Sequence, residues 1–363
     1  MSAPKNNTKK RKKRVPIPVL LVTDLLIAAL YVGSFYQLNY RTERTLTSAG
    51  IVIENTTSTS TTSTESTATT VASATDTTAS SDTVATDVTS TDSSDSAAET
   101  TASSADWSEK FAEYFTDEVV STDTTYSSSN ISITVTQYTQ GSGSDIITYY
   151  VADIYVADIE CLQTGFADDT YGVGYTDSVL GMDEDLSALL AINGDYYGNG
   201  SDGVVIRNGV VYRDTVNGSD VCVLYYDGTM VTYSADEFDI DEAIANGAWQ
   251  AWSFGPELLD ESSGSMTEFT SDGHMASVNP RTAIGYYEPG HYCFVVVDGR
   301  QSGYSEGMTL TQLSALMEEL GCTTAYNLDG GKSSEMTFND TYVNQPASGG
   351  REVSDAVIIT EVE

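Results

Sequence analysis

"YCFVVVDGRQSGYSEGMTLTQLSALMEELGCTTAYNLDGG", residues 292–331, decides the fold of this chain. It opens with a nearly continuous apolar run, as a buried strand should. A helix is predicted from Thr309, because Gln312 completes a capping box and Gly321 suits the C-terminal cap. A second strand then runs to Gly331. A crossover of this length predicts two parallel strands in one sheet. The predicted inner stripe of the helix is Leu310, Leu313, Leu316, Met317 and Leu320.

Both strands of this unit end in an aspartate–glycine turn, "DGR" at 298–300 and "DGG" at 329–331. Parallel strands end on the same side of a sheet. Asp298 and Asp329 are therefore predicted at one sheet edge, where open α/β sheets place their ligands.

A hairpin turning at Pro289-Gly290 brings a further residue to this edge, because its register places Arg281 opposite Asp298 within one step. A plain Arg281–Asp298 salt bridge is the structural alternative. The chain has a net charge of -37, so a group of cations beside glycine turns favours a bound anion. Arginine can form two parallel hydrogen bonds with a phosphate, and the N–H groups of the turns add further donors. The predicted cluster is Arg281, Asp298, Arg300, Asp329 and Lys332.

The segment "NLDGGKSSEM", residues 327–336, has the composition of a phosphate loop. A nucleotide-binding P-loop requires G-x-x-x-x-G-K-[ST]. With Gly331-Lys332-Ser333 as its end, the first glycine falls on Tyr326, so that motif is excluded. The segment could still bind a phosphate group that does not belong to a nucleotide.

The rest of the region from 107 onward predicts a strand-rich fold. "ISITVTQY" and "IITYYVADIYVADIECL" have strand composition. "GVVIRNGVVYRD" and "VCVLYYDGTMVTY" are hairpins whose Asn208-Gly209 and Asp227-Gly228 pairs suit type I′ turns. "DWSEKFAEYFTDEVV" has apolar residues at helical spacing and predicts an amphipathic helix. Packing on its own domain is the expectation, and contact with the membrane or a partner is the alternative. The fold class is α+β or mixed α/β, with a mixed sheet, hairpins and at least one parallel strand–helix–strand unit.

The N-terminus predicts a membrane anchor. Residues 1–14 hold seven of the sixteen basic residues, and an apolar run follows at 15–38. That order predicts a membrane helix with a cytoplasmic basic tail and an extracellular C-terminal part. Asp24 weakens the helix, but lies near its inner end. A cleaved signal peptide is the alternative, although no A-x-A-like site follows the run.

Residues 39–106 are dominated by Ser, Thr, Ala and Asp, which predicts a disordered stalk. A leading helix and connection then occupy 107–129, and a catalytic domain occupies 130–363. The net charge of -37 makes nucleic acid an improbable partner. The cysteines could form disulfides of undetermined pairing or remain buried thiols. They are Cys161, Cys222, Cys293 and Cys322.

Five blocks in order carry a family resemblance: "AINGDYYGNG…GVVIRNGVVY", "SFGPELL", "NPRTAIGYY", "VVVDGRQSGYSEGMTLTQLSALMEELGC" and "AYNLDGGKSSEM". Over about residues 130–361, the chain resembles bacterial phosphodiester glycosidases, which are similar to the catalytic domain of N-acetylglucosamine-1-phosphodiester α-N-acetylglucosaminidase. The resemblance implies hydrolysis of a sugar-1-phosphodiester at the anomeric carbon. The substrate would be a surface glycan or exopolysaccharide with an N-acetylglucosamine-like sugar.

The resemblance also implies a set of site residues. Lys332 departs from the family pattern, which has a third glycine there; lysine would be strained if the position needs a positive φ, and would otherwise add a cation. The candidate catalytic residues are Asp298, Asp329 and Asp195. The candidate substrate-binding residues are Arg281, Arg300, Asn193, Gly194, Asn327, Gly330, Gly331, Lys332, Ser333 and Ser334.

The expected mechanism uses Arg281 and Arg300 for the phosphate. Asp298 or Asp329 would act as base or nucleophile, and Asp195 would bind sugar hydroxyls or supply a second carboxylate. Glu306 or Glu335 could take the place of one of these carboxylates. His274 and His291 lie outside the motifs and are given no role. No cofactor is required by the sequence, although the aspartates could hold Ca²⁺ or Mg²⁺. The alternatives are a phosphodiesterase that cleaves the P–O bond and a glycan-binding module without turnover.

Overall fold

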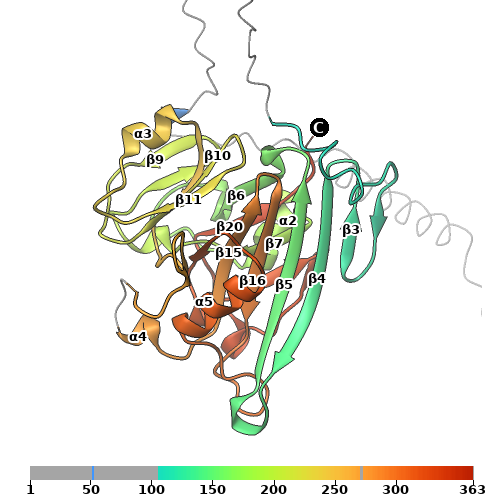
Figure 1. Ribbon diagram of the computed structural model, residues 1–363, viewed down its shortest axis with the longest axis vertical. Helices are drawn as coiled ribbons and strands as arrows, with labels where there is room; N and C mark the ends of the chain where they lie inside the picture. Colours follow the sequence, from blue (N-terminus) through green and yellow to red (C-terminus); the bar gives the residue numbers. More distant parts are fainter. Residues whose placement is uncertain (1–50, 53–104, 270–272, 363) are drawn as a thin grey trace, which may run out of the picture. The chain divides into compact units, whose positions relative to one another are not determined.

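The computed structural model describes residues 51–52, 105–269 and 273–362 (Figure 1). The predicted basic tail and membrane helix lie outside the described residues, as does the predicted stalk apart from 51–52 and 105–106. In the described ranges, no helix is long and apolar enough to cross a membrane. Within the predicted stalk, residues 51–52 form the short strand β1 (Ile51–Val52), which pairs with β9.

A seven-stranded sheet contains both strands of the segment 292–331. Its strand order is β17-β15-β16-β5-β4-β3-β2, and each neighbouring pair is antiparallel. The strands are β2 (Val120–Ser121), β3 (Thr125–Ser127), β4 (Ile131–Gln140), β5 (Ile147–Val156), β15 (Arg281–Glu288), β16 (His291–Val297) and β17 (Thr324–Asn327).

The strand–helix–strand unit is confirmed in direction but not in adjacency. β16 leads through α5 (Leu310–Glu319) to β17, and both strands are antiparallel to β15, which lies between them. The predicted mixed sheet is therefore wrong, because the hairpin partner β15 fills the place beside β16. The capping box of Thr309 and Gln312 is confirmed, and the predicted stripe of α5 packs in the core.

Alternate residues of β16 enter two different cores, as the period-2 geometry of a strand requires. Phe294 and Val296 face a five-stranded sheet, whereas Cys293 and Val295 face α5. The second sheet is covered on its far side by α2 (Val179–Leu186), which completes four layers of helix, sheet, sheet and helix (Figure 1). Its order is β19 (Thr341–Tyr342), β18 (Met336–Phe338), β7 (Leu190–Asn193), β20 (Asp355–Ile359) and β6 (Leu162–Phe166).

A six-stranded sheet, with α3 (Ile240–Ala245) packed near it, contains the two other predicted hairpins. Asn208 and Gly209 have φ of 52° and 71°, as a type I′ turn requires. In the second hairpin only Gly228 has a positive φ, 81°, and the loop is one residue longer than predicted. The strand order is β1, β9 (Val210–Arg213), β8 (Val205–Arg207), β12 (Ala248–Trp252), β10 (Val221–Tyr225) and β11 (Met230–Tyr233).

The remaining elements are short. β13 (Leu259–Asp260) pairs with β14 (Gly264–Ser265), and α4 (Gly273–Ala276) precedes β15. The 3-10 helices are η1 (Gly143–Asp145), η2 (Ile159–Cys161), η3 (Ala167–Asp169), η4 (Tyr197–Asn199), η5 (Gly331–Ser333) and η6 (Ala347–Gly349).

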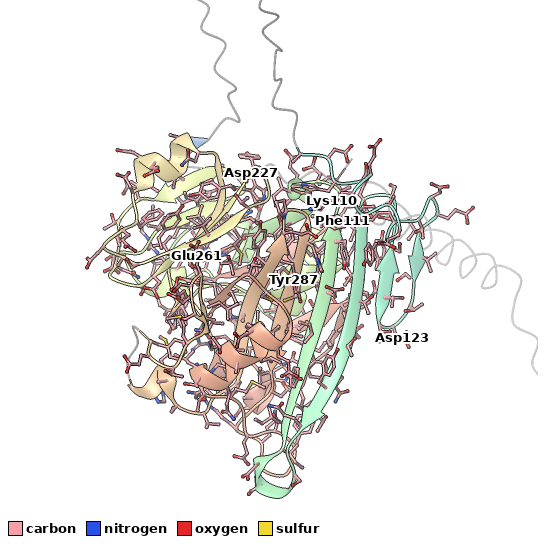
Figure 2. The ribbon with its side chains drawn as sticks, in the orientation of Figure 1. Lys110, Phe111, Asp123, Asp227, Glu261 and Tyr287 are labelled. Atoms are coloured by element: carbon pink, nitrogen blue, oxygen red, sulfur yellow. The ribbon has the colours of Figure 1, made fainter. Side chains whose placement is uncertain are left out.

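The predicted leading helix is wrong, because residues 108–114 form turns. Trp107 and Phe111 are buried, however, so the segment packs on its own domain as expected. Phe111 is labelled in Figure 2. A Cβ on Gly228 would lie 2.4 Å from the Trp107 ring. Trp107 also contacts Gly290. These contacts with glycine turns determine the conformation of the segment, since an isolated helix this short is only marginally stable.

All four cysteines are buried and free in the described structure. Cys293 Sγ and Cys322 Sγ lie 3.6 Å apart.

Candidate functional site

The ends of β16 and β17 and the start of β15 enclose a cavity of about 180 Å³, which we call the arginine cavity. The two turns meet there as predicted, although Arg281 pairs with Val297, one register step from Asp298. The cavity is lined by Phe254, His274, Met275, Asn279, Pro280, Arg281, Arg300, Asn327, Asp329, Gly330 and Gly331.

Arg281 is a buried cation held by neutral groups. Its side chain donates from Nε to the Met308 carbonyl at 2.9 Å, and from one Nη to the carbonyls of Met275 and Ser277 at 2.6 and 2.5 Å. Burial, helped by the nearby charge of Arg300, lowers the pKa of Arg281 to about 10. A buried cation without a carboxylate partner among the described residues is poised to receive an anion.

Arg300 reaches the same cavity from the turn after β16. It has a positive φ of 58°, and one of its Nη atoms donates to Asn279 Oδ1 at 2.7 Å. Its guanidinium lies against Gly331, where an added Cβ would come within 3.1 Å of it. Gly331 itself has a φ of 71°. Both space and backbone conformation therefore require a glycine there.

Asp329 is the carboxylate of the arginine cavity. Its Oδ1 accepts from the Gly330 N–H at 2.8 Å, and its Oδ2 accepts from Ser333 Oγ at 2.6 Å and pairs with Arg351. Burial raises the pKa of Asp329, while the Ser333 and Arg351 contacts oppose that rise. The donors fix both oxygens, so the carboxylate is oriented before a substrate arrives.

Asn193 and Gly194 support the Asp329 turn rather than line the cavity. Asn193 is buried at the end of β7, and its Nδ2 donates to the Asp329 carbonyl at 2.7 Å. A Cβ on Gly194 would lie 2.1 Å from Asp355 Oδ1, so only glycine fits.

Asp195 belongs to a buried ion-pair network. Arg207 donates to Asp195 at 2.9 Å and to Asp355 at 2.9 Å, and the Ser253 N–H donates to the second oxygen of Asp195 at 3.0 Å. Burial raises the pKa of Asp355 to about 7, although Arg207 opposes that rise. This network fixes the β7 turn against the strand that carries Arg207.

Asp298 lies outside the lining of the arginine cavity. Its Oδ2 accepts from Tyr304 OH at 2.8 Å and from the Gln345 N–H at 3.0 Å, and its Oδ1 accepts from Asn344 Nδ2 at 2.8 Å. These contacts join the β16 turn to the segment after β19. The alternative salt bridge with Arg281 does not form.

The other residues of "NLDGGKSSEM" divide by position. Asn327 lines the cavity, and Ser333 holds Asp329. Ser334 is buried outside the lining, and Lys332 is exposed. Lys332 does not have a positive φ, so a lysine is unstrained there. The predicted cation for the cluster is instead supplied by Arg351.

A second cavity, of about 260 Å³, adjoins the first, because Phe254 and Met275 line both. We call it the tyrosine cavity. Arg351 connects the two, since its guanidinium lies 4.8 Å from the Tyr196 ring and also pairs with Asp329. The other lining residues are Asp195, Tyr196, Tyr197, Asn199, Gly200, Asp202, Val204, Arg213, Asn217, Ser219 and Ser253.

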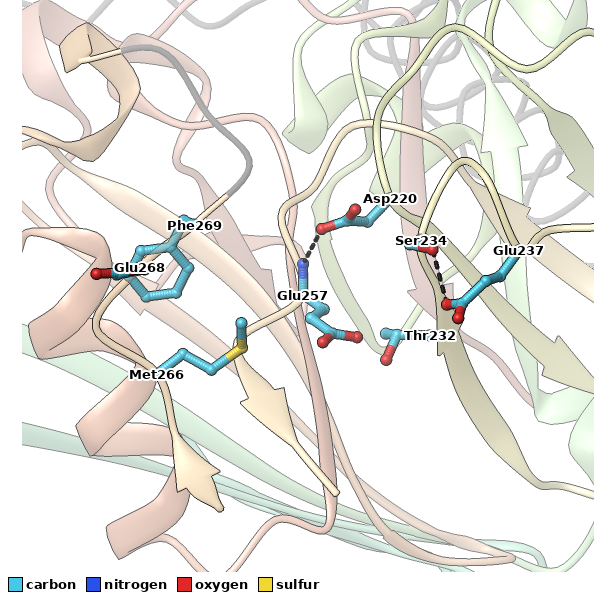
Figure 3. A pocket seen from close by; sticks show the side chains of 8 residues that line it. All are labelled: Asp220, Thr232, Ser234, Glu237, Glu257, Met266, Glu268 and Phe269. Atoms are coloured by element: carbon cyan, nitrogen blue, oxygen red, sulfur yellow. Dashed lines mark hydrogen bonds between the residues drawn. The ribbon is translucent and has the colours of Figure 1, made fainter. Parts of the chain in front are cut away.

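A third cavity, of about 410 Å³, is acidic (Figure 3). We call it the acidic cavity. Burial raises the pKa of both Asp220 and Glu257. Its lining consists of Asp220, Thr232, Ser234, Glu237, Glu257, Met266, Glu268 and Phe269.

Sequence reasoning missed Arg351, Arg207 and Asp355 as parts of the site. Arg351 follows "SGG", a glycine turn like the others, and that spacing could have drawn attention to it. Arg207 ends an otherwise apolar strand, and a charge in such a strand indicates a buried partner. In the described ranges, no group of three or more His, Cys, Asp or Glu side chains could hold a metal ion.

Comparison with known proteins gives a family match over the region that contains these cavities. Residues 187–360 match the family described as phosphodiester glycosidase. The chain is 32% identical over 197 residues to the SPbeta prophage-derived uncharacterized protein YomE of Bacillus subtilis (strain 168). That alignment covers 52% of this chain and 30% of the relative, so the chain spans less than a third of that protein.

A solved structure shares the fold. The zebrafish N-acetylglucosamine-1-phosphodiester alpha-N-acetylglucosaminidase catalytic domain, auto-inhibited by its pro-peptide, matches with a TM-score of 0.51 and 19% identity. The match covers 64% of this chain and 84% of that chain. The match of residues 187–360 to the phosphodiester glycosidase family confirms the resemblance seen in the sequence.

Proposed function

We propose that this protein hydrolyses the glycosyl–phosphate bond of a sugar-1-phosphodiester. The observation that carries the proposal is the burial of Arg281 beside Arg300 and the Asp329 carboxylate in one cavity. Arg281 has three backbone carbonyls as acceptors and no described carboxylate partner. A phosphodiester anion supplies the charge that would complete this arrangement.

In this proposal each polar group has a separate task. Arg281 and Arg300 bind the phosphate, whose negative charge grows as the glycosyl bond breaks. Asp329 activates water or attacks the anomeric carbon, which becomes oxocarbenium-like. Arg351 and Ser333 oppose the rise in the pKa of Asp329 that burial causes, and they hold its carboxylate oriented. Asp195 and Asp298, which are bound by several donors each, act as structural carboxylates.

The tyrosine cavity would accommodate the remainder of the substrate. It joins the arginine cavity through Phe254 and Met275 and offers the ring of Tyr196 together with amide and hydroxyl groups. Such mixed surfaces suit a glycan. The basic and apolar N-terminal segments favour an enzyme anchored in the cell membrane with its domain outside. The substrate we propose is then a surface glycan or exopolysaccharide that carries an N-acetylglucosamine-like sugar in phosphodiester linkage.

The test incubates the full-length chain with UDP-N-acetylglucosamine and with a simple N-acetylglucosamine-1-phosphodiester, and measures released sugar. We expect release that falls at least about 100-fold in Asp329→Asn, since that substitution keeps the shape but removes the charge. Glu257→Gln, in the acidic cavity, is the matched control and should retain activity. Equal rates in both variants would reject Asp329 as the reacting carboxylate.

Labelled water distinguishes the enzyme alternatives. Cleavage of the glycosyl bond places the label on the sugar, whereas P–O cleavage by a phosphodiesterase places it on the phosphate. Binding of glycan with no release from folded protein would instead favour a binding module.

We propose that turnover does not depend on a divalent cation, because the two arginines supply positive charge at the cavity. Dialysis against a chelator should leave the rate within about twofold, a change small beside the hundredfold or larger losses typical when a charge-stabilising group is removed. Loss of activity that Ca²⁺ or Mg²⁺ restores would overturn this proposal.

A further inference from the structure

Asn327 carries an acceptor that the phosphate cannot use. The residue ends β17, is 1% exposed and lines the arginine cavity. Its Nδ2 donates to the Gly255 carbonyl at 2.7 Å, which fixes the orientation of the amide. Its Oδ1 is left without a hydrogen-bond partner in the described part of the chain.

A buried acceptor without a partner is uncommon and calls for a donor. A phosphodiester at neutral pH bears only acceptor oxygens, so it cannot satisfy Asn327 Oδ1. The arginines of the same cavity offer donors, which suit that phosphate. The cavity lining therefore combines donors suited to an anion with Asn327 Oδ1, a neutral acceptor left for a different part of the ligand.

We infer that Asn327 Oδ1 accepts a hydrogen bond from the substituent on carbon 2 of the sugar, either an amide N–H or a hydroxyl. Carbon 2 is bonded to the anomeric carbon, so its substituent is the ring donor nearest the phosphate. The other neighbour of the anomeric carbon, the ring oxygen, can only accept. Asn327 is thus a specificity-determining residue, and this inference rests on the proposed function for the placement of the phosphate.

The test measures binding, so that it does not require turnover. Calorimetry with the full-length chain compares N-acetylglucosamine-1-phosphate, glucose-1-phosphate and 2-deoxyglucose-1-phosphate. We expect 2-deoxyglucose-1-phosphate to bind at least about tenfold more weakly than the better of the other two, because it leaves the buried acceptor unpaired. In Asn327→Ala that ratio should fall to about one, since the acceptor is gone.

Using a ratio within each variant removes the effect of any lost stability. Thr164→Val is the matched control, because Thr164 Oγ1 is also buried and unpartnered among the described residues but lies outside all three cavities. It should keep the wild-type ratio.

Two failures can be told apart. Equal binding of all three sugar phosphates to the wild type overturns the role of Asn327 and leaves the proposed function standing. If Asn327→Ala keeps the wild-type ratio of affinities, the role of Asn327 is likewise overturned and the proposed function stands. Water or another group would then donate to Asn327 Oδ1. Binding of none of the three at about 10 mM, a concentration that detects even millimolar affinity, overturns both.

Discussion

The arginine cavity and the acidic cavity make opposite use of charge within one domain. The acidic cavity is larger, about 410 Å³ against 180 Å³, and its lining holds four carboxylates and neither lysine nor arginine. The smaller cavity holds Arg281 and Arg300 with a single carboxylate, Asp329. In a chain with a net charge of -37, a hollow lined by carboxylates is what composition supplies by default.

A cationic hollow in the same chain has to be built by specific contacts. Arg281 is held by three carbonyls, Arg300 by Asn279, and Gly331 leaves space for a guanidinium. The difference teaches that cavity size does not locate the site here. The site is located instead by the number of groups that hold buried charged side chains in place.

The largest effect expected from this comparison comes from Arg281→Met. It should lower kcat/KM by about 100- to 1000-fold, because it removes a preformed charge partner of the phosphate. Sugar-release assays check this result. Glu237→Gln in the acidic cavity provides the matching charge change and should have little effect. Similar losses in both variants would mean that the two cavities do not differ in function.

Within the glycine turn, neighbouring positions should respond differently. Gly331→Ala should reduce kcat/KM about tenfold or more and lower stability by about 1 kcal/mol, because alanine is strained at a φ of 71° and its Cβ approaches Arg300. Lys332→Gly should change kcat/KM by less than about twofold, since Lys332 lies outside the cavity. Kinetics and thermal unfolding of the pair test this. A stronger effect of Lys332→Gly would place the lysine at the substrate.

Arg351→Gln should change the pH dependence more than the maximal rate. Arg351 opposes the rise in the pKa of Asp329 that burial causes, so its removal should raise that pKa further. The acidic limb of kcat/KM should then move to higher pH, because Asp329 must be ionised to react. An unchanged limb would show that a different group sets it. Arg351→Lys, which keeps a charge, should give the smaller displacement.

A buried carboxylate away from both cavities should affect stability alone. Asp183 in α2 is fully buried, and burial raises its pKa to about 7 from an ordinary value of 3.8. The folded protein therefore holds a proton that the unfolded chain releases, so stability should fall as pH rises from about 4 to about 7. Thermal unfolding across that range should show the decline, and Asp183→Asn should flatten it. The same slope in that variant would assign the proton to other groups.

The part of the fold that the sequence determined is the part governed by local rules. The capping box at Thr309, the turn at Asn208-Gly209 and the alternation in β16 each follow from a few neighbouring residues. The leading helix failed because Trp107 and Phe111 are positioned by distant glycine turns. The mixed sheet failed because sequence spacing gives the direction of β16 and β17 but not which strand lies between them.

The candidate site shows the same limit. Arg281, Arg300 and Asp329 were predicted together from the hairpin register and from the two turns that follow parallel strands, whereas Asn327 came from the family resemblance. Asp298 was grouped with them on the same grounds, but its side chain turns to Tyr304, Asn344 and Gln345, which strand order does not reveal. Arg351 was missed because its contact with Asp329 spans 22 residues without a periodic pattern to indicate it.

The position of β20 has a consequence for the order of events during synthesis. β20 lies between β6 and β7, so the five-stranded sheet stays open until residues 355–359 have left the ribosome. The segment 281–331, with both cavity arginines and Asp329, is made earlier. Until residues 351–355 have been made, Asp329 lacks Arg351 and Arg207 lacks Asp355. Under the proposed function, the Asp329 carboxylate would thus become fully oriented for hydrolysis only after this later segment has been made.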